Sequence, residues 1–363
     1  METKEANMIV IDADGHVEES TAMFSGLEKK YYSRRPIALS FDRDTAYGDH
    51  NAVWLIDGKT YPKVIGKGGV TYRTPTLMDA AREKPVSIGS QEMTDIATRL
   101  NDLDKSGIGK QVVYPTLFLG PTTDDVKFEA ALIRCYNDFM ADACSKSDGR
   151  MRFAALVPIR DVDASVSELR RAKALGAASV MIPGVAWDRS LGSEELYPFY
   201  EEAADLDIPV CVHFGYGCPA ITGAFESAES FNSAVLPVIM GFRSVMTSGV
   251  LETIPKLRVA FLEIGSMWVP YVIHQLKRGR RVRTDPAEYF KAGRAYVACE
   301  ADEDINYVAS WIGEDAFVMA SDFPHGDPSR EENMEKAVMA RNDVPLAIRE
   351  KILYSNPQKL YGL

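Results

Sequence analysis

Eight short apolar runs rich in β-branched residues recur along the chain, and stretches with helical periodicity lie between them. Strands that alternate with helices predict a parallel sheet, and eight such units predict a closed (β/α)8 TIM barrel. A doubly wound open sheet is the alternative. The predicted strands cover residues 8–12, 111–114, 153–157, 179–182, 209–213, 259–262, 295–299 and 317–320, and the predicted helices cover 95–105, 126–144, 164–175, 193–206, 234–248, 305–312 and 330–339.

Two motifs that would favour the open sheet do not occur. No G-x-G-x-x-G follows the first run, and no G-x-x-x-x-G-K-[ST] occurs anywhere in the sequence. The first motif binds the pyrophosphate of a dinucleotide, and the second binds the phosphates of a nucleoside triphosphate. We therefore expect neither ligand, and the barrel is the favoured fold.

Residues 20–95 interrupt the alternation of strands and helices. The segment holds aromatic and Gly/Pro-rich stretches with little helical period. Long loops inside compact domains commonly act as lids or binding loops. We therefore expect a single barrel over residues 1–363, in which residues 20–95 form an insertion after the first strand that covers the carboxyl face as a lid.

The composition argues against several classes of partner. The net charge is -11, so the chain has no surplus of cations to neutralise nucleic-acid phosphates or an anionic membrane surface. No run approaches the roughly 20 apolar residues of a membrane span, and the N-terminal residues do not form a signal peptide. Five cysteines without a C-x-x-C pair fit reduced thiols. These features predict a cytoplasmic protein without nucleic-acid or membrane partners.

Carboxylates and histidines gather at the ends of the predicted strands, where the catalytic groups of a barrel lie. Asp14 and His16 follow the first run two residues apart, so their side chains point the same way. Oxygen and imidazole ligands that converge at one face favour a metal. The candidate ligands are Asp14, His16, Glu19, His213, Glu263, Asp322 and His325.

Each of these residues also has a purely structural interpretation. His213 could be a core histidine bonded to a carbonyl, Glu263 could cap the helix that begins near Ser266, and Asp322 could cap a turn. Three of the five histidines in the chain nevertheless fall at or just after a predicted strand end. Taken together, the pattern favours the metal site.

Five segments carry a resemblance to a known family: IDADGHVEE, RCYNDFMADAC, FLEIGSMWVPY, ASDFPH and SNPQKLYG. They resemble the amidohydrolase-related branch of the amidohydrolase superfamily, which includes aminocarboxymuconate semialdehyde decarboxylase and the resorcylate-type decarboxylases. The resemblance implies a distorted TIM barrel that binds a divalent metal. It also implies metal ligands at Asp14, His16, His213 and Asp322.

The chain departs from that family at two positions. Asp14 stands where mononuclear members usually carry His or Glu. Glu263 stands where the decarboxylases and hydrolases carry a catalytic His. The usual proton donor or acceptor of these reactions is therefore replaced in this chain.

The number of candidate ligands exceeds the need of one metal, since a single Zn²⁺ takes about three protein ligands and water. Carboxylates without thiolates favour Fe or Mn over Zn, and the DGH and LE-x-G pattern is similar to that of non-haem di-iron monooxygenases of this fold. The favoured hypothesis is a dinuclear Fe/Fe or Fe/Mn monooxygenase that uses O₂ to hydroxylate an unactivated carbon of a small acid or acyl compound. Glu263, Asp322 and His325 are its predicted catalytic residues.

Two other functions remain open. The first is a mononuclear Zn- or Mn-dependent decarboxylase or hydrolase, in which Asp322 also moves a proton and Glu19 and His325 only orient the ligands. The second is a non-catalytic barrel that supports an active partner. The resemblance implies a homodimer or larger homo-oligomer, and the predicted substrate in either enzyme is a small molecule.

Overall fold

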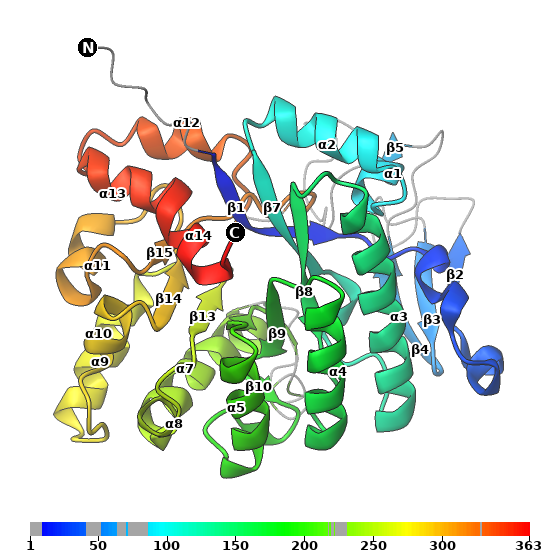
Figure 1. The fold of residues 1–363 in the computed structure, drawn as a ribbon, viewed down its shortest axis with the longest axis horizontal. Coiled ribbons are helices and arrows are strands. Elements are labelled where there is room, and N and C mark those ends of the chain that lie inside the picture. The colour runs from blue at the N-terminus through cyan, green and yellow to red at the C-terminus, as the bar shows by residue number, and fades with distance from the viewer. Residues whose placement is uncertain are drawn as a thin grey trace.

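Eight parallel strands form one sheet in the order β1-β7-β8-β9-β12-β13-β14-β15. The computed structural model describes residues 9–40, 52–63, 70–71, 86–216, 218, 221, 231–326 and 329–363. Each predicted strand overlaps an observed one, and the helices lie around the ring of strands (Figure 1). The strands are β1 (Ile11–Val17), β7 (Lys110–Pro115), β8 (Met151–Leu156), β9 (Ser179–Pro183), β12 (Val210–His213), β13 (Val259–Leu262), β14 (Ala295–Ala298) and β15 (Phe317–Val318).

The ring closes between the first strand and the chain that follows the last one. The amide of Ala13 donates to the carbonyl of Met319 at 3.0 Å, and the amide of Asp322 donates to the carbonyl of Asp14 at 3.1 Å. The C-terminal helix α14 packs against β1 and β15 at this seam. The architecture is therefore the TIM barrel that the alternation of strands and helices predicts.

Every predicted helical segment overlaps an observed helix. Several helices begin at an aspartate whose carboxylate accepts a backbone N–H of the first turn, as at Asp95, Asp125 and Asp161. None of the described helices is long and apolar enough to cross a bilayer. The helices are α1 (Ile88–Gln91), α2 (Ile96–Lys105), α3 (Val126–Ser145), α4 (Val162–Ala174), α5 (Tyr197–Asp205), α7 (Leu236–Ser248), α8 (Val250–Thr253), α9 (Trp268–Arg278), α10 (Pro286–Lys291), α11 (Ile305–Ile312), α12 (Met334–Met339), α13 (Leu346–Glu350) and α14 (Asn356–Tyr361).

The first strand extends beyond the apolar run that predicts it. The run ends at Asp12, whereas β1 continues to Val17, so Asp14 and His16 lie within the strand. The register of β1 against β7 shifts between Asp12 and Gly15. A Cβ at Gly15 would lie only 2.2 Å from the side-chain nitrogen of Gln111, so this irregular segment requires glycine.

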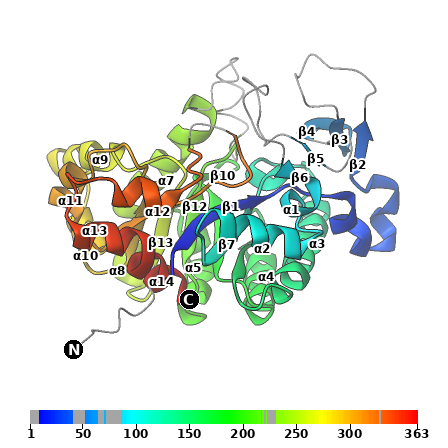
Figure 2. The same cartoon turned by 90° about the horizontal axis from the view of Figure 1, so that it is seen from above.

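The insertion between β1 and α2 contains its own small sheet. Strands β2 (Ile37–Ser40), β3 (Ala52–Ile56) and β4 (Lys59–Lys63) are antiparallel, and β5 (Val70–Thr71) pairs with β6 (Val86–Ser87). Figure 2 shows β2, β3 and β4 beside the ring of helices rather than within it. Residues 41–51, 64–69 and 72–85 of the predicted lid lie outside the described residues.

The described part of the insertion packs against the loop that follows β7. The guanidinium of Arg34 pairs with Asp125 at 2.7 Å, and the Lys59 ammonium pairs with Asp124 at 3.0 Å. The Tyr61 hydroxyl donates to the carbonyl of Pro121 at 3.0 Å. The insertion is thus anchored to a loop at the carboxyl face, and its role as a lid stays a prediction.

Candidate metal centre

Six of the seven predicted site residues meet at the carboxyl ends of the strands. They come from β1, from the end of β12, from the residue that directly follows β13, and from the loop after β15. All six side chains are buried, with at most 3% of the side-chain surface exposed. The six residues are Asp14, His16, His213, Glu263, Asp322 and His325.

One side of the cluster is built around His213. Its Nε2 lies 2.9 Å from Oδ2 of Asp14 and 3.2 Å from Oε2 of Glu263. The Nε2 of His16 lies 3.4 Å from Oδ1 of Asp14 and 3.6 Å from the same Glu263 oxygen. These four residues offer ligand atoms that all lie within 4.8 Å of one another.

The other side of the cluster is built around Asp322. Its Oδ1 lies 3.4 Å from Nε2 of His16 and 2.8 Å from Nδ1 of His325. The imidazole of His325 stacks on that of His16, with the ring centroids 3.9 Å apart. His16, Glu263, Asp322 and His325 form a second group of ligand atoms within 4.8 Å, so His16 and Glu263 belong to both groups.

The residues fit a divalent cation. Oδ1 of Asp14 and Nε2 of His16 are buried and have no hydrogen-bond partner among the residues the structure describes. Buried polar atoms are normally hydrogen-bonded, and buried carboxylates need a compensating positive charge. A cation held by these oxygen and imidazole groups satisfies both needs, and this ligand type suits Mn, Fe or Zn.

The imidazoles are oriented so that one nitrogen of each faces the cluster. Nδ1 of His16 bonds the carbonyl of Pro115, and Nδ1 of His213 bonds the carbonyl of Phe214, both at 2.8 Å. A carbonyl only accepts, so Nδ1 of each ring carries a hydrogen, and Nε2 of each ring faces the cluster, where it could bind a metal. In His213 this Nε2 lies at hydrogen-bond distance, 2.9 Å, from Oδ2 of Asp14. Burial holds the pKa of His16 well below its usual value, and the neighbouring imidazoles of His325 and His213 lower it further. His16 is thereby kept neutral, as a ligand must be.

The backbone places the two later carboxylates in an unusual conformation. Glu263 has φ 60° and Asp322 has φ 54°, the left-handed region that non-glycine residues seldom adopt. The structural interpretation of Glu263 as a helix cap does not hold, because Glu303 accepts the amides of Ser266 and Met267 instead. Both carboxylates therefore face the cluster at a cost in backbone strain.

Glu19 lies outside both groups of ligand atoms. Its two oxygens accept the amides of Thr116 at 3.0 Å and Leu117 at 2.7 Å. Burial raises the pKa of Glu19 to about 8. The hydroxyl of Thr116 in turn lies 2.9 Å from Nε2 of His325. Glu19 is thus placed to hold the loop that orients His325.

A buried arginine that the sequence patterns do not mark hydrogen-bonds both the first strand and the loop after the last strand. Arg99 has no exposed surface, and its guanidinium donates to the carbonyl of His16 at 2.9 Å and to that of Phe323 at 3.3 Å. It also donates to the side-chain oxygen of Gln111 at 2.7 Å. Burial lowers the Arg99 pKa to about 10, so the group stays charged at neutral pH.

Asp12 continues this network on the other side of Gln111. Its carboxylate accepts the Gln111 amide at 2.6 Å, the Ser321 amide at 2.9 Å and the Ser321 hydroxyl at 2.5 Å. Ser321 directly precedes Asp322, so the network fixes the backbone on both sides of the seam. An aspartate inside an apolar run is a signal that could have marked Asp12, because charged residues are seldom fully buried without partners.

A cavity of about 400 Å³ opens onto the cluster from the loops after β13, β14 and β15. Glu263 and Asp322 line it together with Cys299, Ser329 and Arg330. This volume falls within the range of small-molecule sites. The cavity is therefore large enough to hold a small molecule beside the cluster.

The comparisons with known proteins give a family and several relatives. The family model Amidohydro_2, described as amidohydrolase, matches residues 100–363. A 2-amino-3-carboxymuconate-6-semialdehyde decarboxylase of Dictyostelium discoideum is 22% identical over 289 residues, which cover 74% of this chain and 77% of that protein.

Two solved structures share the fold. An amidohydrolase of Mycobacterium avium subsp. paratuberculosis K-10 has a TM-score of 0.78 at 20% identity, with 98% of each chain covered. The 5-carboxyvanillate decarboxylase of Novosphingobium aromaticivorans, complexed with manganese, has a TM-score of 0.69 at 17% identity, with 99% of this chain and 98% of that chain covered. The decarboxylase of Dictyostelium discoideum matches the decarboxylase alternative better than the dinuclear monooxygenase.

Proposed function

Since the chain belongs to the amidohydrolase family Amidohydro_2, we propose that it is a metal-dependent decarboxylase that acts on a small organic acid. The observation that carries the proposal is the buried cluster of carboxylates and imidazoles at the carboxyl face. Its relatives include decarboxylases, one of which is complexed with manganese. We therefore propose Mn as the first metal to test, with Zn as the alternative.

The residues proposed to hold one metal are Asp14, His16, His213 and Asp322. A divalent metal held by them would polarise an oxygen of the substrate and stabilise negative charge that develops during the reaction. The hydrogen bonds from His16 to Pro115 and from His213 to Phe214 keep the two imidazoles in place. The site is thus preorganised before a substrate enters.

Glu263 is the proposed proton donor. Loss of CO₂ breaks a carbon–carbon bond and leaves the electron pair on the substrate, so that carbon must receive a proton. Glu263 lines both the 400 Å³ cavity and the cluster, and no other carboxylate outside the proposed ligand set belongs to the described groups. His325, held by Thr116 and Asp322, is proposed to replace the proton on the active-site carboxyl.

The insertion is proposed to cover the carboxyl face as a lid. Its described part is anchored to the loop after β7 by the ion pairs of Arg34 and Lys59. A cover of this kind would exclude water and so keep the developing negative charge in a medium of low dielectric. We also propose that the protein forms a homo-oligomer.

The test is a decarboxylation assay on metal-loaded protein. The protein is supplied with Mn²⁺ and incubated with a panel of hydroxylated aromatic and unsaturated acids, while CO₂ release and deuterium incorporation from D₂O are measured. We expect CO₂ release with at least one acid and a loss of at least about 100-fold in Glu263→Gln with metal content retained. Glu300→Gln, a carboxylate of the same cavity outside both ligand groups, is the matched control. A Glu263→Gln variant that decarboxylates at the wild-type rate would contradict the role of Glu263.

The second candidate function is the dinuclear iron or iron–manganese monooxygenase. The observation that favours it is the presence of two four-residue groups that share His16 and Glu263. One carboxylate and one imidazole common to two groups could serve two cations held close together. About two Fe or Mn per chain, with O₂ uptake after reduction and no CO₂ release from any acid, would favour this function over the decarboxylase.

A further inference from the structure

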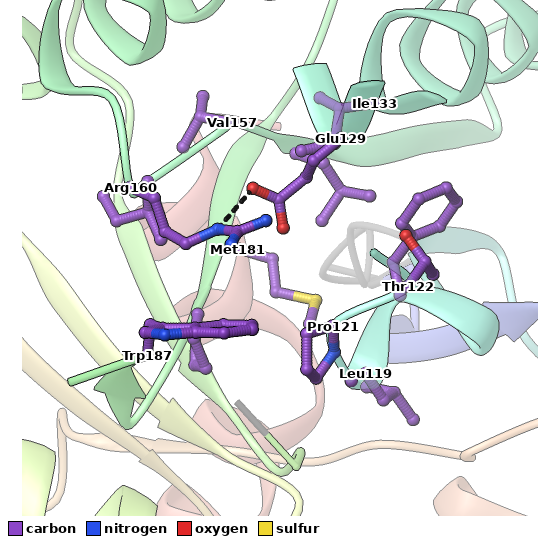
Figure 3. Close-up of a pocket in the computed structure, with 14 residues that line it drawn as sticks. Leu119, Pro121, Thr122, Glu129, Ile133, Val157, Arg160, Met181 and Trp187 are labelled. Carbon is purple, nitrogen blue, oxygen red and sulfur yellow. Dashed lines mark hydrogen bonds and ion pairs between the residues drawn. The ribbon is translucent and has the colours of Figure 1, made fainter. Parts of the chain in front are cut away.

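A second cavity lies at the carboxyl face between the loops that follow β7, β8 and β9 (Figure 3). Its volume is about 70 Å³. The wall is mostly apolar, with Ile133, Val157, Met181 and Trp187 among its side chains. None of the residues of the candidate metal centre lines it.

Two residues that line the cavity are neighbours of the strand and loop that carry His213. Pro183, which lines the cavity, is the register partner of His213 across the β9–β12 ladder. The carbonyl of Leu119, another lining residue, accepts the amide of Tyr216 at 2.6 Å, and Tyr216 lies three residues after His213. The cavity therefore borders the strand and the loop that position one of the proposed metal ligands.

The two charged side chains of the wall, Arg160 and Glu129, neutralise each other. Arg160 and Glu129 form an ion pair at 2.9 Å, and their side chains are only 11% and 15% exposed. The Arg160 guanidinium also donates to the carbonyls of Asp124 at 3.1 Å and Thr123 at 2.8 Å. A ligand carboxylate here would meet Glu129 as well as Arg160, so the wall favours an uncharged group.

Trp187 closes the cavity on the side opposite Glu129. The Arg160 guanidinium lies over the Trp187 ring, 4.3 Å from its centroid, and Figure 3 shows the two planes stacked. Trp187 has φ 63° and joins the short strands β10 (Val185–Ala186) and β11 (Arg189–Ser190). The indole is thus held by a tight hairpin and by the buried ion pair, which gives the cavity a fixed wall.

The volume limits the size of the occupant. A cavity of about 150 Å³ holds a benzene ring, and a water molecule takes a share of about 30 Å³. A cavity of about 70 Å³ is therefore too small for a ring and has room for two or three carbon-sized groups. An ethyl or methoxy group has this size and no charge.

We propose that this cavity is a specificity pocket, in which a short uncharged substituent of the substrate lies while the carboxylate lies at the metal centre. The proposal rests on the decarboxylase function. Trp187, Met181 and Val157 are then residues that select among substrates without taking part in the chemistry.

The test compares the binding of homologous acids to the Mn²⁺-loaded protein by calorimetry. The probes are 2-hydroxybenzoate and its 3-, 4- and 5-ethyl homologues. We expect at least one ethyl homologue to bind about tenfold more tightly than the parent, the gain that burial of two carbons supplies. Val157→Phe should remove that gain and leave the parent acid unchanged, whereas Trp187→Ala should extend it to a propyl group. Val282→Phe, between α9 and α10 and away from the cavity, is the matched control.

Each outcome decides something different. Equal binding of all homologues by the wild-type protein, or an ethyl preference that persists in Val157→Phe, would overturn the specificity pocket and leave the decarboxylase untouched. If no acid binds, 2-hydroxybenzoates are not ligands of this metal centre, and crystals under xenon pressure then test the pocket alone. Xenon beside Met181 in the wild type but not in Val157→Phe would support an apolar pocket, and no xenon there in the wild type would overturn it.

Discussion

The two sides of the metal centre are held in place by different means. His213 and Glu263 sit at the ends of neighbouring strands whose regular parallel ladder sets their spacing. Asp14, His16 and Asp322 sit at the seam, where the first strand is irregular and the last has only two residues. There a buried network of side chains adds to the few backbone hydrogen bonds that close the ring. Substitutions away from the metal centre should therefore lower metal affinity more when they alter the seam, which holds Asp14, His16 and Asp322, than when they lie near the ladder that holds His213 and Glu263.

The largest effect is expected from the residue that belongs to both sides. His16→Ala removes a ligand atom from each four-residue group, and the remaining carboxylates then repel one another without the metal. We expect loss of stoichiometric metal and loss of activity to background, measured by plasma mass spectrometry and CO₂ release. Substitution of the exposed His274 to Ala is the control. Metal retained in His16→Ala would show that the cluster is not the binding site.

The next largest effect tests the seam network directly. Arg99→Met removes the buried guanidinium that donates to the carbonyls of His16 and Phe323 and to Gln111. Each buried acceptor left without a donor costs roughly 1–3 kcal/mol, so the total is roughly 3–5 kcal/mol. We expect that loss in the free energy of unfolding, together with Mn²⁺ affinity lowered about 10–100-fold in the folded protein. Arg170→Met, which breaks the exposed ion pair with Glu202, should cost no more than about 1 kcal/mol. If denaturant titrations showed that the two variants lose the same free energy of unfolding, the seam network would be no more important to stability than a surface ion pair.

A smaller effect is expected one contact away from the ligands. Thr116→Val keeps the shape of the side chain but removes the hydroxyl that holds Nε2 of His325. Loss of a group that orients a site residue costs about 10–100-fold in activity. We expect the activity of Thr116→Val to fall by an amount near the upper end of that range, while the unfolding midpoint stays unchanged. Thr98→Val on the surface of α2 is the control. Full activity in Thr116→Val would show that the reaction does not depend on the orientation of His325.

The last effect concerns the pH dependence of stability at Glu19. Its pKa is raised by burial from 4.5 to about 8, so the folded protein holds a proton that the unfolded chain releases above pH 4.5. The contribution of Glu19 is therefore fully present below pH 4.5 and is lost as pH rises to about 8. The difference in unfolding free energy between wild type and Glu19→Gln should fall over that interval. A difference that is flat or rises with pH would contradict a protonated Glu19.

The sequence predicts the parts of the molecule that depend on local pattern. Strands β12 and β13 end at or just before His213 and Glu263, and because parallel strands end on one face, the meeting of these residues could be predicted. The end of β1 could not, because the bulge at Gly15 depends on the Gln111 side chain about 100 residues away in the chain.

The parts that the sequence does not predict depend on distant partners. Arg99 acts on His16 and Phe323, and no spacing in the chain connects the three residues. Glu19 follows His16 by three residues, yet its carboxylate turns to the amides after β7, because the chain leaves the strand at Val17. Sequence spacing shows which strand end a residue is near but not which neighbour its side chain reaches.

The central claim is that the buried carboxylate and imidazole cluster binds a divalent metal. The direct measurement is metal content by plasma mass spectrometry on protein expressed with added Mn and Fe and purified without chelators. The account predicts about one divalent metal per chain in the wild type and almost none in His16→Ala. A metal-free wild-type protein that takes up no Mn²⁺ on dialysis would contradict it.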